Sequence, residues 1–150
     1  MARASFHSDR SWHFGVPRDE LWRRIVSTGE YKLWWPWLRT FESEGGLAAN
    51  QRWTCVVAPP LPYTVRFHIH FDRVDPARLV ESVVTGDIGG TARLTISDDG
   101  AGSRAQLVSS LHPNNALLRG FGIVARPLVE HGHNWILDRG RQQFVERAFD

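Results

Sequence analysis

The feature that most constrains this chain is a strict two-residue alternation in its middle, at residues 63–74. Its apolar residues are Val65, Phe67, Ile69 and Phe71. The polar residues that alternate with them are Arg66, His68, His70 and Asp72. Successive side chains of a β-strand point to opposite faces, so this pattern predicts a strand with one dry face and one wet face. The dry face marks the interior of the protein.

Six further segments are predicted as strands, because each is rich in apolar or alternating residues and most end at Gly, Pro or Asp turn signals. These strands are Ala4–Phe14, Phe41–Glu44, Arg52–Ala58, Arg78–Asp87, Thr91–Ser97 and Ser103–His112. The predicted connections include Gly45-Gly46, Pro59 to Pro62, Asp75-Pro76, Gly89-Gly90 and Asp98 to Gly102. Since six of the seven strands follow one another without a helix, the sheet is expected to be an antiparallel meander.

Helical spacing is confined to the two ends of the chain. Pro17 suits a first helical position and predicts a helix to about Ser27, and a short second helical segment, Glu30–Leu38, carries three tryptophans. After the last strand, Asn114 or Asn115 caps a possible helix that Pro127 kinks or restarts. The long final helix then has an apolar stripe made of Val129, His133, Ile136, Gly140 and Phe144.

Length, charge and cysteine content narrow the class of protein. A chain of 150 residues predicts one domain, 1-150, and shows neither a secretion signal nor an apolar run long enough for a membrane span. Cys55 is the only cysteine, which excludes an intramolecular disulfide and suits a cytoplasmic location. The net charge is +2 and the arginines are scattered singly, so nucleic acid is not an expected partner.

Several segments, taken in order, resemble one family. They are WWPWL at Trp34 to Leu38, PPLPY at Pro59 to Tyr63, GDIGG at Gly86 to Gly90 and HNWILDRG at His133 to Gly140. The chain resembles the polyketide cyclase/dehydrase and lipid-transport family of the START-like superfamily, whose fold is the pollen-allergen-type helix-grip. This resemblance implies an α+β fold with a seven-stranded curved antiparallel sheet around a long C-terminal helix, in the order strand, two helices, six strands, helix.

The resemblance also implies a deep cavity between helix and sheet, used across relatives to bind lipids, polyketides, hormones or aromatic metabolites. Strand alternation and the helix stripe supply its predicted walls, which are mostly apolar as in other small-molecule cavities. The predicted ligand-binding residues are Trp34, Trp35, Trp37, Trp53, Cys55, Tyr63, Phe67, Ile69, Phe71, Leu94, Ile96, Leu107, Ser109, Phe121, Val129, His133 and Ile136. Gly132, where a larger residue is expected, widens that cavity. The alternative is a solid core with the tryptophans packed over the barrel mouth.

Histidine pairs raise the question of a metal site. His68 and His70 share a strand face, but that face is the solvent side, and His131 and His133 point about 200° apart on a helix. No third ligand is evident, so no metal and no cofactor are predicted. His133 lies on the sheet-facing stripe, where an imidazole is suited either to proton transfer or to a plain structural hydrogen bond.

Three functions remain open from the sequence. The first is binding or carriage of a hydrophobic or aromatic small molecule, which enters between the proline-rich loop, the tryptophan segment and the start of the final helix. The second is a polyketide cyclase or dehydratase that uses His133 as its acid or base, and the third is a protein-interaction module built on exposed tryptophans. The strand faces of Glu81 and Asp87 stay undecided, an outward Arg93 is preferred, and oligomeric state and ligand identity are also open.

Overall fold

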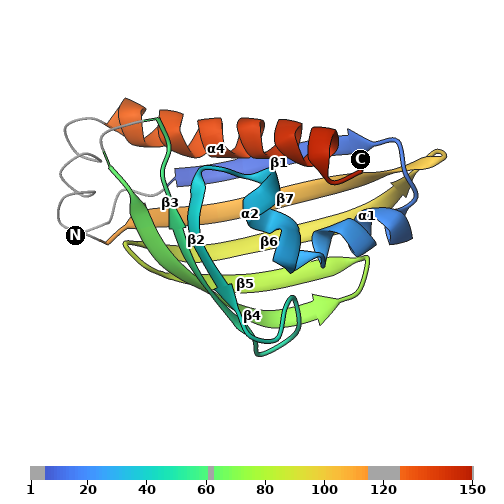
Figure 1. The fold of residues 1–150 in the computed structure, drawn as a ribbon, viewed down its shortest axis with the longest axis horizontal. Helices are drawn as coiled ribbons and strands as arrows, with labels where there is room; N and C mark the ends of the chain where they lie inside the picture. Colours follow the sequence, from blue (N-terminus) through green and yellow to red (C-terminus); the bar gives the residue numbers. More distant parts are fainter. Residues whose placement is uncertain (1–5, 61–62, 115–125, 150) are drawn as a thin grey trace.

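The computed structural model describes residues 6–60, 63–114 and 126–149, with side chains from residue 130 onward in the last range. Seven antiparallel strands form one sheet in the spatial order β1-β7-β6-β5-β4-β3-β2 (Figure 1). The strands are β1 Phe6–Phe14, β2 Leu38–Ser43, β3 Arg52–Val57, β4 Val65–Asp75, β5 Leu79–Gly86, β6 Ile88–Asp99 and β7 Gly102–Pro113. The meander predicted from the sequence is therefore confirmed.

Short helices close one end of the sheet and a long helix lies along it (Figure 1). They are α1 Arg18–Ile25, the 3₁₀ turn η1 Thr28–Glu30, α2 Tyr31–Trp34 and α4 Arg126–Arg147. The second helical segment ends before Pro36, which cannot continue a helix, and Leu38 already belongs to β2. The helix expected after Asn114 lies outside the described residues. None of the described helices is both long enough and apolar enough to cross a bilayer.

One predicted turn is wrong. Gly89-Gly90 lies inside β6, with Gly90 paired to both Val84 and Leu111, so β6 starts earlier than the sequence suggested. Gly90 has a φ of 141°, and a Cβ there would overlap the carbonyl oxygen of Ser110. The glycine therefore permits close approach of two strands and does not mark a chain reversal.

Strand register settles which side chains share a face, because directly opposed residues of antiparallel strands point the same way. Phe67 opposes Cys55, and Ile69 opposes both Trp53 and Val84. Leu94 opposes Leu107. This set faces α4, as predicted from alternation.

The register also assigns the residues whose facing the sequence left undecided. Glu81 opposes Arg93, and both point to the outer face of the sheet. Asp87 lies in the β5–β6 connection, where its Oδ2 accepts a hydrogen bond from the backbone N–H of Arg66 at 2.9 Å. The preference for an outward Arg93 is confirmed.

An aromatic cluster fills the interior beneath the C-terminal half of α4. Phe144 on this helix packs edge-on against Phe14 and Trp34, with ring centroids 5.7 and 5.5 Å apart. Tyr31 and Trp53 continue the cluster toward β2 and β3, with centroids 5.6 Å apart. Such pairs add about 0.5–1.5 kcal/mol each beyond their buried area, so this end of the molecule is a packed core.

Polar contacts fix α4 on both sides of that core. Trp35 Nε1 donates to the carbonyl oxygen of Gly140 at 2.9 Å, and Arg147 Nη1 donates to the carbonyl oxygen of Trp34 at 2.8 Å. On β1, the Arg10 guanidinium binds Asp138 Oδ1 at 2.5 Å and Asn134 Oδ1 at 3.0 Å. The direction and height of the helix over the sheet are therefore fixed from Asn134 to its end.

Cys55 gives a direct test of this core. Its thiol is only 4% exposed, and burial raises its pKa to about 12. Because the thiolate is the reactive form, we expect native protein at pH 8 to stay unmodified by a disulfide reagent for hours, while protein in urea reacts within minutes. Absorbance of the released thiol reports both rates, and rapid stoichiometric modification of the native protein would contradict the packing described.

Candidate functional site

The middle of the inner face is less covered than the aromatic end. Leu94 and Leu107 oppose each other on the neighbouring non-edge strands β6 and β7, yet both side chains are only half-buried. The next opposed pair toward the aromatic end, Ile96 and Ala105, is 3% and 4% exposed. Because strands flank β6 and β7 on both sides, Leu94 and Leu107 are accessible only from the side of α4. Both leucines therefore keep some accessible surface on the side of α4.

A row of small side chains crosses the sheet next to these leucines. The row runs over four neighbouring strands and consists of Ser8, Ser109, Ala92 and Ser82. Each strand thus contributes a short inward side chain at the same level. Two of these side chains, Ser82 and Ser109, are buried, at 8% and 5% exposed.

The opposite wall at this level is α4 near Gly132. The helix runs in the same direction as β1, since Asn134 and Asp138 meet Arg10 whereas Phe144 meets Phe14. Ser8 is the inward-facing residue that precedes Arg10 on β1, and the two residues lie about 6.6 Å apart along the strand. The same distance along a helix corresponds to about four residues. The serine row therefore lies opposite the helical turn that contains buried Gly132. We use the name inner chamber for the region between this row, Leu94, Leu107 and α4, which is the candidate site inside the protein.

The predicted ligand-binding residues divide into three groups. Those that are buried are Trp34, Trp53, Cys55, Phe71, Ile96 and Ser109. Those that are half-buried are Trp35, Trp37, Tyr63, Phe67, Ile69, Leu94, Leu107, His133 and Ile136. Phe121 lies outside the described residues, and the side chain of Val129 lies outside the described side chains. Among the described side chains of this set, the half-buried group has the accessible surface that contact with a ligand requires.

A surface groove of about 810 Å³ lies between the proline-rich loop and the tryptophan segment, as predicted for entry, but it runs along the middle of α4 and not at its start. Three segments form it: the link from α2 to β2, the proline-rich loop after β3, and one face of α4. Its lining residues are Pro36, Trp37, Arg39, Ala58, Pro59, Pro60, Tyr63, Thr64, Trp135, Arg139 and Gln143. We call this the mouth groove. Sequence reasoning missed Trp135, Arg39 and Arg139, because Trp135 is off the apolar stripe and the arginines resemble ordinary surface charges.

His133 lies on α4 close to Arg10. Burial, and then the positive charge of the Arg10 guanidinium, lower the pKa of this imidazole, so it is neutral at pH 7. The described side chains provide no hydrogen-bond partner for it, and Arg10 itself is held by Asn134 and Asp138. His133 is therefore a neutral polar group at the edge of the inner chamber without a described acid or base beside it.

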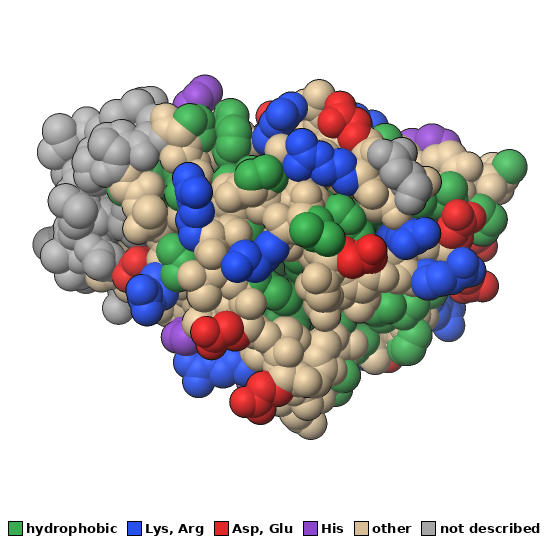
Figure 2. All heavy atoms as spheres, viewed as in Figure 1, with side chains coloured by type: hydrophobic (Ala, Val, Ile, Leu, Met, Phe, Trp, Pro, Cys, Tyr) green, Lys and Arg blue, Asp and Glu red, His purple; other side chains and the backbone are tan. Residues whose placement is uncertain are grey.

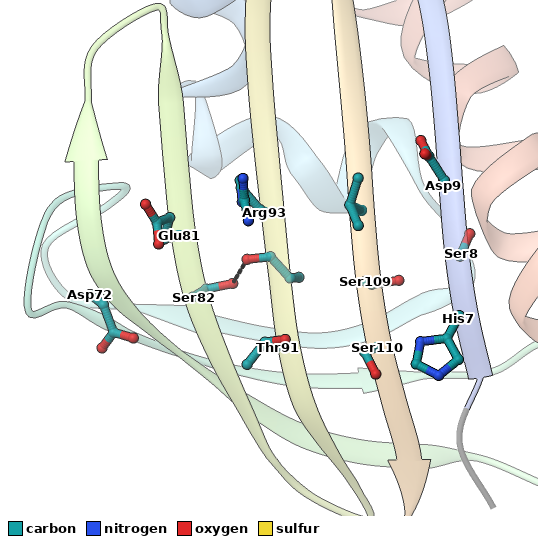
Figure 3. A pocket seen from close by; sticks show the side chains of 12 residues that line it. His7, Ser8, Asp9, Asp72, Glu81, Ser82, Thr91, Arg93, Ser109 and Ser110 are labelled. Atoms are coloured by element: carbon teal, nitrogen blue, oxygen red, sulfur yellow. Dashed lines mark hydrogen bonds between the residues drawn. The ribbon is translucent and has the colours of Figure 1, made fainter.

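A second hollow, of about 480 Å³, lies on the outer face of the sheet (Figure 3). Arg93 lies near its centre, with Glu81 on one side and Asp9 on the other (Figure 3). Charges of both signs also mix on the face of the molecule shown in Figure 2. Among the described residues no group of three or more His, Cys, Asp or Glu side chains is arranged to hold a metal ion. His68 instead contacts Thr54 Oγ1 at 3.0 Å on the outer face.

Solved structures with the same architecture are numerous. The protein TTHA0849 from Thermus thermophilus superposes with a TM-score of 0.77 at 16% identity, covering 97% of each chain. Ara h 8.0201 gives 0.71 at 12% identity over 97% of this chain and 98% of that one. The chain has the helix-grip fold. Norcoclaurine synthase from Thalictrum flavum also matches, with a TM-score of 0.68 at 12% identity over 99% of this chain and 88% of the enzyme.

No family model and no curated protein matches the sequence itself. At these identities the structural neighbours establish the helix-grip fold alone and leave ligand and reaction undetermined.

Ser109 tests the polar content of the chamber wall. It is 5% exposed, and its Oγ has no hydrogen-bond partner among the described residues. An unpaired buried hydroxyl costs about 1–3 kcal/mol. We therefore expect Ser109→Ala to leave the free energy of unfolding unchanged or to raise it by about 1 kcal/mol, measured by urea denaturation. A loss of more than about 1 kcal/mol would show that the hydroxyl is satisfied in the native protein.

His133 predicts a pH dependence of stability. Its folded pKa lies below the unfolded value of about 6.5, so its stabilising contribution is complete above about pH 7 and is lost as the pH falls through the unfolded value. The urea midpoint of the native chain should therefore fall between pH 7 and pH 5 by more than that of His133→Gln. Equal falls in the two proteins would rule out a depressed pKa.

Proposed function

We propose that the protein binds or carries an apolar or aromatic small molecule between the sheet and α4. The observation that carries this proposal is the half-burial of Leu94 and Leu107, which lie on non-edge strands with their side chains toward α4. Apolar side chains that stay accessible inside a domain are typical of ligand cavities, which are lined mainly by apolar groups with few polar ones. The fold shared with Ara h 8.0201 and norcoclaurine synthase supports this use of the interior.

The arrangement of the inner chamber favours a ligand with a flat or elongated apolar body. Its floor is the row of short side chains, its side walls include Phe67 and Ile69, and Ile136 contributes from the helix. The mouth groove supplies Trp37 and Tyr63 at the surface. Burial of apolar area at about 25 cal/mol per Å² provides the main binding energy for such a ligand. The polyketide or lipid class implied by the family resemblance fits this description.

The two rival functions have less support. A cyclase or dehydratase needs His133 to act with a partner group, and the described side chains place none within hydrogen-bond distance of it. An interaction module needs exposed tryptophans, but two of the seven are buried and five are half-buried. We therefore retain ligand binding as the function and His133 as a wall residue. The buried Cys55 suits a reducing compartment, in keeping with the predicted cytoplasmic location.

Fluorescence of the uncharged dye N-phenyl-1-naphthylamine tests the proposal, because its emission rises in apolar surroundings. We expect the native protein to bind one dye molecule, and Ala92→Phe to weaken that binding about tenfold or more by filling the chamber. Ala92→Leu, a smaller increase in volume, should give an intermediate loss and covers the case in which the phenylalanine variant does not fold.

Thr91→Phe is the matched control, since Thr91 neighbours Ala92 on β6 but points to the outer face. This variant should bind the dye as the native protein does. Absence of dye binding by native protein, or equal losses in the Ala92 and Thr91 variants, would reject the inner chamber as the binding site.

A further inference from the structure

The mouth groove has an unusual charge balance. Arg39 enters it from the start of β2 and Arg139 from α4, and no Asp or Glu is among its described lining residues. The chain as a whole has almost as many acidic as basic side chains, 16 against 18. Two arginines without a lining carboxylate thus create a local positive potential at the opening, where an anion would be attracted.

Both guanidinium groups are free to bind an anion. In the described part of the chain, Arg39 has no hydrogen-bond or ion-pair partner, and Arg139 donates only to the neutral amide of Gln142, at 3.0 Å. Other arginines do pair with acids, as Arg10 does with Asp138. A guanidinium presents a planar set of donors that matches a carboxylate, sulfonate or phosphate group.

The aromatic side of the groove is held rigid. Trp37 stacks on Trp35 with centroids 5.7 Å apart, and its Nε1 donates to Oε1 of Gln143 at 2.9 Å. Its backbone carbonyl accepts a hydrogen bond from the N–H of Ala58 at 2.9 Å, which joins it to the end of β3. A preorganised indole face next to two arginines favours a planar ring over a flexible chain, since less side-chain freedom is lost on binding.

Gly140 permits this geometry. A Cβ at position 140 would lie 3.1 Å from Cζ2 of Trp37, closer than most carbon contacts in proteins. The glycine therefore lets the Trp37 ring rest directly on α4. Trp135, one of the other lining residues, offers an indole N–H with no described acceptor. Aromatic faces and hydrogen-bond donors thus meet in one groove without a competing acid.

We propose that the ligand is an aromatic or polycyclic acid: its ring system enters beside Trp37 and its anionic group binds Arg39 and Arg139 at the mouth groove. This inference rests on the proposed function, because the apolar body of the same ligand molecule is bound between the sheet and α4. It adds the requirement for a negative charge, which the inner chamber alone does not impose.

Two dyes with the same ring scaffold separate the two proposals. N-phenyl-1-naphthylamine is neutral, whereas 1-anilinonaphthalene-8-sulfonate carries one sulfonate. We expect native protein to bind the sulfonate at least tenfold more tightly than the neutral dye. The double variant Arg39→Gln/Arg139→Gln should lose about tenfold in sulfonate affinity and keep its affinity for the neutral dye. Raising the salt concentration from about 0.05 M to 0.5 M should weaken binding of the sulfonate dye and leave binding of the neutral dye unchanged.

Arg93→Gln/Arg141→Gln is the matched control, because it removes the same charge from residues outside the groove. It should leave both affinities unchanged, and circular dichroism checks that each variant is folded. Equal binding of the two dyes by native protein, or equal losses in both double variants, overturns the anion site while the proposed function stands. Binding of neither dye overturns the proposed function and this inference together.

Discussion

The structure depends on the attachment of α4 at one end. Phe144 inserts among Phe14 and Trp34, and hydrogen bonds from the tryptophan segment hold the same half of the helix. A helix fixed in this way over a curved sheet need not be supported along its whole length. Toward Gly132 it faces short side chains of the sheet, and the inner chamber follows from that difference in packing. The fold and its candidate site therefore have one physical origin, dense aromatic packing at one end and small residues at the other.

Alternation and turn residues predicted the antiparallel sheet, whereas the wrapping of that sheet around the long helix was implied by the family resemblance. Seven strands, the order of elements and the inward facing of Phe67, Leu94 and Leu107 all follow from a period of two and from antiparallel pairing. The error at Gly89-Gly90 has a general cause. A glycine that allows a neighbouring strand to approach closely cannot be told from a turn glycine in the sequence alone. Only the strand register, here the pairing of Gly90 with Leu111, distinguishes the two roles.

The candidate site was less predictable, for reasons that concern long-range packing. The sequence predicted Trp34, Trp35 and Trp37 together as ligand contacts, yet Trp34 is in the core and Trp37 is at the surface groove. Their fates depend on how α2 meets α4, more than 100 residues away along the chain. Likewise, a serine at position 8 becomes part of a chamber floor only once β1 is paired with β7.

The central claim is that unfilled apolar space lies between the middle of the sheet and α4. Crystals of the protein under xenon pressure test it most directly, because xenon enters apolar cavities that water leaves empty and scatters strongly. We expect xenon density within van der Waals contact of Leu94, Leu107 and Ile136. A well-ordered structure in which side chains fill that region and xenon binds only at the molecular surface would contradict the claim.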